Sequence, residues 1–123
     1  MSQRPLSPHL QVWRWHVTML SSILHRASGV ALYGLALLAV GWLLALSMGP
    51  TTFAGVQTVL GSVLGKLILV AAGGAVGYHV TNGIRHLVWD AGHGFTPKVA
   101  SMASWISLIM GVVGAAWVAG RVF

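Results

Sequence analysis

His79 lies inside an apolar stretch of the chain, where an imidazole side chain is costly unless its nitrogen atoms are used. The segment 79–92 reads H-V-T-N-G-I-R-H-L-V-W-D-A-G. Because each residue of a helix turns by about 100°, His86 and His93 follow His79 at steps of seven along nearly one line. An ionisable group buried in an apolar span generally marks a functional site. These positions therefore define the first candidate site.

The chemistry expected of His79 is metal binding. A hydrogen bond between two helices is the alternative, and it would contribute only about 1 kcal/mol. We predict instead that His79 is a ligand of a metal centre, with a haem iron as the preferred metal. His86 is nearer the interface, where it either meets water or bonds a haem propionate, whereas His93 is expected at the surface.

A second polar cluster begins the first apolar run, where residues 22–29 read S-I-L-H-R-A-S-G. Ser22, His25, Arg26 and Gly29 occur at i, i+3, i+4 and i+7, which is one face of a helix. Such donors suit the carbonyl groups of a quinone at the membrane edge. An anionic haem propionate would also suit Arg26 or His25, and Arg26 alone could simply extend to lipid headgroups. From the residues alone, these donors could serve either the quinone or a haem propionate.

The composition is that of an integral membrane protein. Of 123 residues, 56% are hydrophobic and only 7% are charged, against about 25% charged in soluble domains. The net charge of +6 is spread without a dense basic patch, which argues against nucleic-acid binding. The absence of cysteine excludes iron–sulfur ligation by this chain and covalent haem attachment.

Long uncharged runs predict three transmembrane spans, at approximately 20–47, 63–88 and 99–121. All three should be helices, because a backbone in lipid must satisfy its own hydrogen bonds. A membrane-proximal lead-in is expected over residues 1–19, and a short loop or interfacial piece after the first span, up to about Ser62. The predicted fold is thus all-α and integral to the membrane, with residues 1–123 forming one domain.

Basic residues predict the orientation. Five lie at the face that carries the N-terminus: Arg4, Arg14, Arg26, Arg85 and Lys98. Only Lys66 and Arg121 lie at the other face. Because basic residues favour the cytoplasmic side, we predict a cytoplasmic N-terminus, or one in the matrix of an organelle.

Asp90 is the single acidic residue, and it falls at the end of the second predicted span. We expect it to form a salt bridge with Arg85 that fixes this end of the helix. Its position also argues against a small transporter or channel subunit, the alternative from another class of protein. Such subunits usually need a carboxylate inside the membrane.

Small residues form ridges at helical spacing in the second and third spans. The ridges are Gly73-x-x-x-Gly77 and Gly111-x-x-x-Ala115-x-x-x-Ala119. Both predict close helix packing. Gly83 lies one turn after His79 on the same face, where it either leaves room for a flat macrocycle bound to His79 or serves ordinary packing.

Together, R-P-L-S-P-H-L at 4–10 and the two stretches beginning at Ser22 and His79 carry a family resemblance. The chain resembles the cytochrome b556 subunit of succinate dehydrogenase, the larger membrane anchor of succinate:quinone oxidoreductase. The resemblance covers the full length, with both motifs in the expected order. A fumarate reductase anchor is the alternative within the same class, and some of those anchors carry no haem or two haems.

The resemblance implies roles for individual residues. His79 would be an axial ligand of haem b, with the second histidine supplied by a smaller membrane anchor subunit. Ser22 and Arg26 match quinone-site positions, and His25 would lie between the quinone and a haem propionate. Arg85 and His86 match residues near the propionates.

The resemblance also implies the partners. A flavoprotein subunit would oxidise succinate, and an iron–sulfur subunit would pass the electrons on to ubiquinone. This chain would have no catalytic residue for succinate. It would anchor the soluble subunits on the cytoplasmic face of a bacterial inner membrane, or the matrix face of a mitochondrial one, and supply half of the haem and quinone sites.

Overall fold

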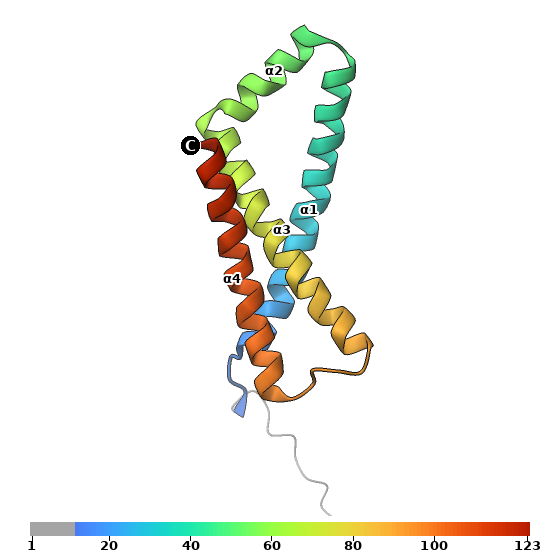
Figure 1. The fold of residues 1–123 in the computed structure, drawn as a ribbon, viewed down its shortest axis with the longest axis vertical. Coiled ribbons are helices and arrows are strands. Elements are labelled where there is room, and N and C mark those ends of the chain that lie inside the picture. The colour runs from blue at the N-terminus through green and yellow to red at the C-terminus, as the bar shows by residue number, and fades with distance from the viewer. Residues whose placement is uncertain (1–11) are drawn as a thin grey trace, which may run out of the picture.

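The computed structural model describes residues 12–123, which fold into four helices and no strand (Figure 1). The helices are α1 (Val17–Ser47), α2 (Pro50–Gly61), α3 (Val63–Asp90) and α4 (Pro97–Val122). Three of them, α1, α3 and α4, are long and apolar enough to cross a membrane. This confirms the predicted all-α membrane fold. Residues 1–11, with most of the expected lead-in, lie outside the described residues.

Side-chain caps fix where the first two spanning helices begin. The first four N–H groups of a helix have no partner within it. At α1, the His16 side chain accepts a hydrogen bond from the backbone N–H of Thr18 at 3.3 Å, so the helix begins three residues before the expected start at 20. At α3, the Ser62 hydroxyl accepts from the N–H of Gly65 at 3.1 Å.

The segment expected as a loop or interfacial piece forms the 12-residue helix α2. Gly49 turns the chain after α1 with φ = 106°, in the region that favours glycine. Pro50 then occupies the first helical turn, where its missing N–H costs nothing. Figure 1 shows α2 connecting the ends of α1 and α3, which diverge at this end of the molecule. Further along the molecule the two helices cross, where the first part of α1 meets the later part of α3.

Helices α3 and α4 pack closely through small residues, as the glycine ridges predict. A Cβ atom added at Gly77 would lie 2.5 Å from the carbonyl oxygen of Met110. One added at Gly111 would lie 3.1 Å from the Cβ of Tyr78. Gly114, which the predicted ridge omits, also faces α3 and lies against Gly73 and Gly77. The interface follows the i, i+3 spacing from Gly111 as well as the i, i+4 spacing.

Polar and apolar side chains are distributed in the opposite way to those of a soluble protein. Among the described residues the buried apolar side chains are only Ala45 and Tyr78. The buried polar ones are Ser21, Asn82, Arg85, Ser104 and Ser107. Large apolar side chains such as Val30 and Tyr33 are 76% and 70% exposed. Contiguous exposed apolar surface of this extent is not stable in water, so these faces contact lipid or other membrane subunits.

Candidate functional site

Three of the predicted site residues come together where α1 crosses α3. The imidazole rings of His25 and His79 are stacked, with centroids 4.0 Å apart and planes 18° apart. The ring of His86, two turns further along α3, lies 5.0 Å from that of His25. His93 is exposed beyond the end of α3. The structure therefore gathers His25, His79 and His86 into one histidine cluster.

Ser28 joins this cluster, although sequence reasoning did not single it out. Its Oγ atom lies 2.9 Å from Nδ1 of His79 and donates a hydrogen bond to the carbonyl oxygen of His25 at 2.9 Å. The available signal was its position three residues after His25, on the same side of α1. A hydroxyl so close to a predicted ligand histidine belongs to the candidate site.

Glycine allows the close approach of the two helices at this point. A Cβ atom at Gly29 would lie 3.2 Å from Cε1 of His79, tighter than ordinary contact. At Gly83, the position expected to face a macrocycle or a neighbouring helix, an added Cβ would lie 4.0 Å from Cε1 of His25. In this chain the ring of His25 therefore lies beside Gly83.

Ser22 and Arg26 lie next to the histidine cluster but outside it. They are four residues apart and so share one side of α1. Ser22 is half-buried and Arg26 is exposed. Within residues 12–123, no hydrogen bond joins either side chain to another residue. Both donors are thus available to a ligand or a partner on that side of the helix.

Arg85 does not occupy the position that the predicted salt bridge with Asp90 requires. It is only 6% exposed, and its Nη1 donates to Oδ1 of Asn82 at 3.1 Å. Its guanidinium carbon lies 4.0 Å from the ring centroid of Trp89. The expected salt bridge with Asp90 is wrong for this structure, where the two residues form no ion pair. Positions five apart on a helix differ by about 140° around its axis, so Asp90 is directed to the surface.

A buried polar network continues from Arg85 to α1. The hydroxyl of Ser21 donates to Oδ1 of Asn82 at 2.8 Å and accepts from Nη1 of Arg85 at 3.2 Å. The hydroxyl of Tyr78 donates to the carbonyl oxygen of Ser21. Ser21 and Asn82 are fully buried. Nε of Arg85 is buried without a hydrogen-bond partner among the described residues, so the network is only partly satisfied. The bonds that it does make join α3 to α1 at this rotation.

Asn82 links the network to the histidine cluster, because its Nδ2 lies 3.4 Å from Nε2 of His86. Sequence reasoning missed the network. The signal present was the spacing of Tyr78, Asn82 and Arg85 at i, i+4 and i+7 along one side of α3.

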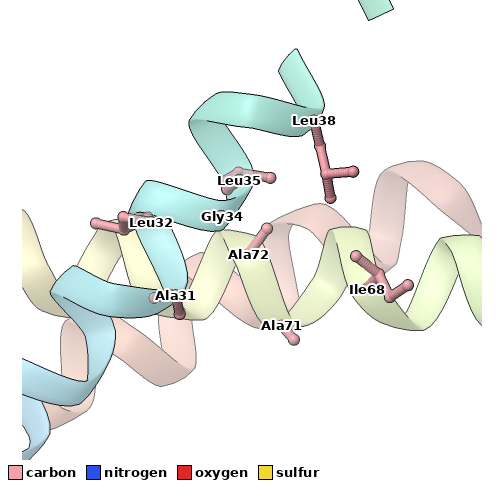
Figure 2. A pocket seen from close by; sticks show the side chains of 9 residues that line it. Ala31, Leu32, Gly34, Leu35, Leu38, Ile68, Ala71 and Ala72 are labelled. Atoms are coloured by element: carbon pink, nitrogen blue, oxygen red, sulfur yellow. The ribbon is translucent and has the colours of Figure 1, made fainter. Parts of the chain in front are cut away.

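An apolar cavity of about 470 Å³ opens between α1 and α3 (Figure 2). Along both helices it lies beyond the histidine cluster, toward the ends that α2 connects. Its walls are mostly small and branched side chains: Ala31, Leu35 and Leu38 from α1, and Ile68, Ala72 and Ala75 from α3. Ile68, Ala72 and Ala75 precede His79 by eleven, seven and four residues, so they continue the helix face of His79. The site thus combines a polar end with an apolar one.

The residues present suit a haem in their chemistry. Nδ1 of His25 is buried without a hydrogen-bond partner in the described part of the chain. Such an atom is costly in an apolar environment unless a ligand completes it. An imidazole ligand, nearby donors for carboxylate groups and an apolar cavity are what a macrocycle with anionic side chains requires.

Three apolar spans that enclose buried polar side chains define a multi-pass membrane protein, with its polar site between the first two spans. The chain belongs to the family of succinate dehydrogenase/fumarate reductase transmembrane subunits, whose model matches residues 1–118.

Individual relatives agree with this membership. The succinate dehydrogenase cytochrome b556 subunit of Rickettsia felis is 37% identical over 112 residues, covering 91% of this chain and 87% of the relative. The subunit of the same description from Paracoccus denitrificans is 42% identical over 101 residues, covering 82% and 78%. The mitochondrial cytochrome b560 subunit of Sus scrofa is 40% identical, covering 91% and 68%.

Proposed function

We propose that this chain is the haem b- and ubiquinone-binding membrane anchor of succinate dehydrogenase, on the electron path from succinate to ubiquinone. The observation that carries the proposal is the stacking of His25 on His79 inside a membrane span, with Ser28 bonded to His79. Imidazoles placed there are costly unless a ligand uses their nitrogens. The description of the relatives as cytochrome b subunits supports haem as that ligand.

In this proposal His79 is one axial ligand of haem b. When bound, the haem supplies a one-electron redox centre, whose chemistry is its own. His25 and His86 lie beside His79 and would hold the propionates, and Arg85 contributes positive charge from the buried network. The second axial histidine would come from a smaller anchor subunit, as the resemblance to the family implies.

Ser22 and Arg26 would bind the quinone head group. They share one side of α1 and have no partner among the described residues, so their donors are free for the quinone oxygens. The guanidinium of Arg26 would also stabilise the negative charge that develops on an oxygen as electrons arrive. His25, which lies between Ser22 and Arg26 in the same turn of α1, would connect this site to the haem side of the helix.

The rest of the chain would serve assembly. The second anchor subunit would cover the apolar cavity between α1 and α3. With the basic residues at the N-terminal face, the flavoprotein and iron–sulfur subunits would dock on the cytoplasmic or matrix side. The iron–sulfur subunit would hold the clusters that this chain, without cysteine, does not ligate.

The purified complex tests this function directly. We expect succinate-driven reduction of ubiquinone and one haem b per complex, measured by a reduced-minus-oxidised optical spectrum and by haem extraction. No haem, or two haems, together with faster quinol oxidation than quinone reduction would favour a fumarate reductase anchor. A complex without flavoprotein and iron–sulfur subunits would contradict the proposal.

Replacing Arg26 with leucine should impair quinone reduction while the complex still assembles. Loss of a charged donor at a reacting oxygen costs on the order of 10²-fold in rate, and at least about tenfold is expected here. The measurement is succinate:quinone reductase activity in membranes, normalised to the amount of complex. Arg121→Leu removes an exposed arginine at the opposite end of the chain and is the control. Full activity of R26L at normal complex levels would remove Arg26 from the quinone site.

A further inference from the structure

We propose that Ser28 is a positioning residue that holds His79 in the tautomer with its proton on Nδ1, leaving the lone pair of Nε2 for a metal. The proposal rests on the proposed role of His79 as a haem ligand and extends it to a residue of α1. It is carried by the two hydrogen bonds of the Ser28 hydroxyl, one to the carbonyl of His25 and one to Nδ1 of His79.

The direction of the hydrogen bonds follows from counting protons. A serine hydroxyl has one proton to donate and lone pairs with which to accept. The carbonyl oxygen of His25, 2.9 Å away, can only accept, so the hydroxyl proton is directed to it. Toward Nδ1 of His79, also 2.9 Å away, the Ser28 oxygen then acts as acceptor. With the hydroxyl proton directed to the carbonyl, Nδ1 is the donor and carries a proton, and in the neutral imidazole Nε2 does not.

This arrangement prepares His79 to bind a metal through Nε2. A metal-bound histidine usually donates its second N–H to an oxygen, which fixes the ring orientation and raises the basicity of the ligating nitrogen. Within residues 12–123, the hydrogen bond of His79 involves Nδ1 alone. Ser28 thus supplies the oxygen from a different helix, so the tautomer is correct only when α1 and α3 are packed together.

Local packing reinforces the effect on ring orientation. Gly29 follows Ser28, and a Cβ atom there would lie 3.2 Å from Cε1 of His79. The half-buried ring of His79 therefore contacts the hydroxyl of Ser28 and the stacked ring of His25 on its α1 side, close to Gly29. Rotation of the imidazole about its Cβ–Cγ bond would break the bond to Ser28 and press the ring against α1.

Other serines of the chain show what an ordinary structural role looks like. Ser104 and Ser107 are fully buried and donate to the carbonyl oxygens of Ala100 and Ala103, one turn earlier in α4. Such bonds to the preceding turn are common for serine in helices. Ser28 makes a bond of this kind and, in addition, a second one to His79. Ser107→Ala is therefore the matched control for Ser28→Ala.

The test compares Ser28→Ala, Ser28→Thr and Ser107→Ala in the complete complex, by redox titration of the haem and by haem content. Without the acceptor, a less basic His79 stabilises ferric iron less. We expect Ser28→Ala to shift the equilibrium between ferric and ferrous haem about tenfold toward the ferrous form. This corresponds to a rise of about 59 mV in the midpoint potential. Haem retention should fall about tenfold or more. Ser28→Thr keeps the hydroxyl and should stay within about twofold of the unmodified complex, as should Ser107→Ala.

A second measurement does not depend on haem. In the full chain in lipid bilayers, the nitrogen NMR signals of His79, assigned by their loss in His79→Leu, report which ring nitrogen carries the proton. We expect the Nδ1–H form, and a loss of this preference in Ser28→Ala. An Nε2–H tautomer, or an unchanged midpoint potential in S28A with normal haem content, would overturn the proposal. A haem-free unmodified complex would instead contradict the proposed function, and the NMR result would still decide the role of Ser28.

Discussion

Replacing His79 with leucine should abolish the low-spin b-type signal in a reduced-minus-oxidised spectrum of the complex. The substitution removes the only axial ligand that this chain is proposed to provide, and leucine has no lone pair to replace it. With only the ligand that the second anchor subunit is proposed to supply, the haem would be high-spin or absent. Since each ligand of a metal site contributes strongly to affinity, we expect at least about a tenfold loss of bound haem.

His93→Leu is the matched control for this experiment. His93 follows His79 by two steps of seven residues, but it is exposed and lies beyond the last residue of α3. It should leave the spectrum unchanged. A low-spin signal of normal intensity in H79L would show that His79 is not an axial ligand. In that case the histidine cluster would need another explanation, such as hydrogen bonding between α1 and α3 alone.

Replacing Gly77 with leucine should prevent stable assembly of the complex. At Gly77 the backbone of α3 lies directly against α4, and an added Cβ would be 2.5 Å from the carbonyl oxygen of Met110. Because that atom belongs to the backbone of a helix, only a separation of α3 from α4 can relieve the clash. Overpacking typically costs 1–3 kcal/mol, and about 3 kcal/mol or more is expected for this backbone contact.

The measurement is the amount of intact complex in membranes, by native electrophoresis, together with its thermal unfolding temperature in detergent. Gly120→Leu is the control, because a Cβ at Gly120, apart from its own helical turn, meets no atom of residues 12–123 within 4 Å. We expect G120L to assemble normally and G77L to be nearly absent or to unfold at a clearly lower temperature. Normal yield and unchanged melting of G77L would contradict the close packing of α3 on α4.

Gly77 and His79 could both be identified from the sequence, whereas the buried position of Arg85 could not. Gly77 was predicted as a packing residue because small residues four apart on an apolar helix have few other uses. His79 was singled out because a lone imidazole in an uncharged run is costly without a ligand. Neither inference needed a partner helix. The buried place of Arg85 did need one, and the predicted salt bridge with Asp90 failed because the guanidinium turns to Ser21 and Asn82 instead.

The sequence by itself determined the three spans and the polar residues within them. Uncharged runs of membrane length have one stable backbone form in lipid, and helical periodicity then decides which residues share a face. Only the tertiary structure decided which faces meet. The stacking of His25 on His79, the bond from Ser28 to His79 and the network of Ser21 with Asn82 all join α1 to α3. Periodicity leaves the relative rotation and crossing point of two helices free, and these are set by packing and hydrogen bonding between residues more than fifty positions apart.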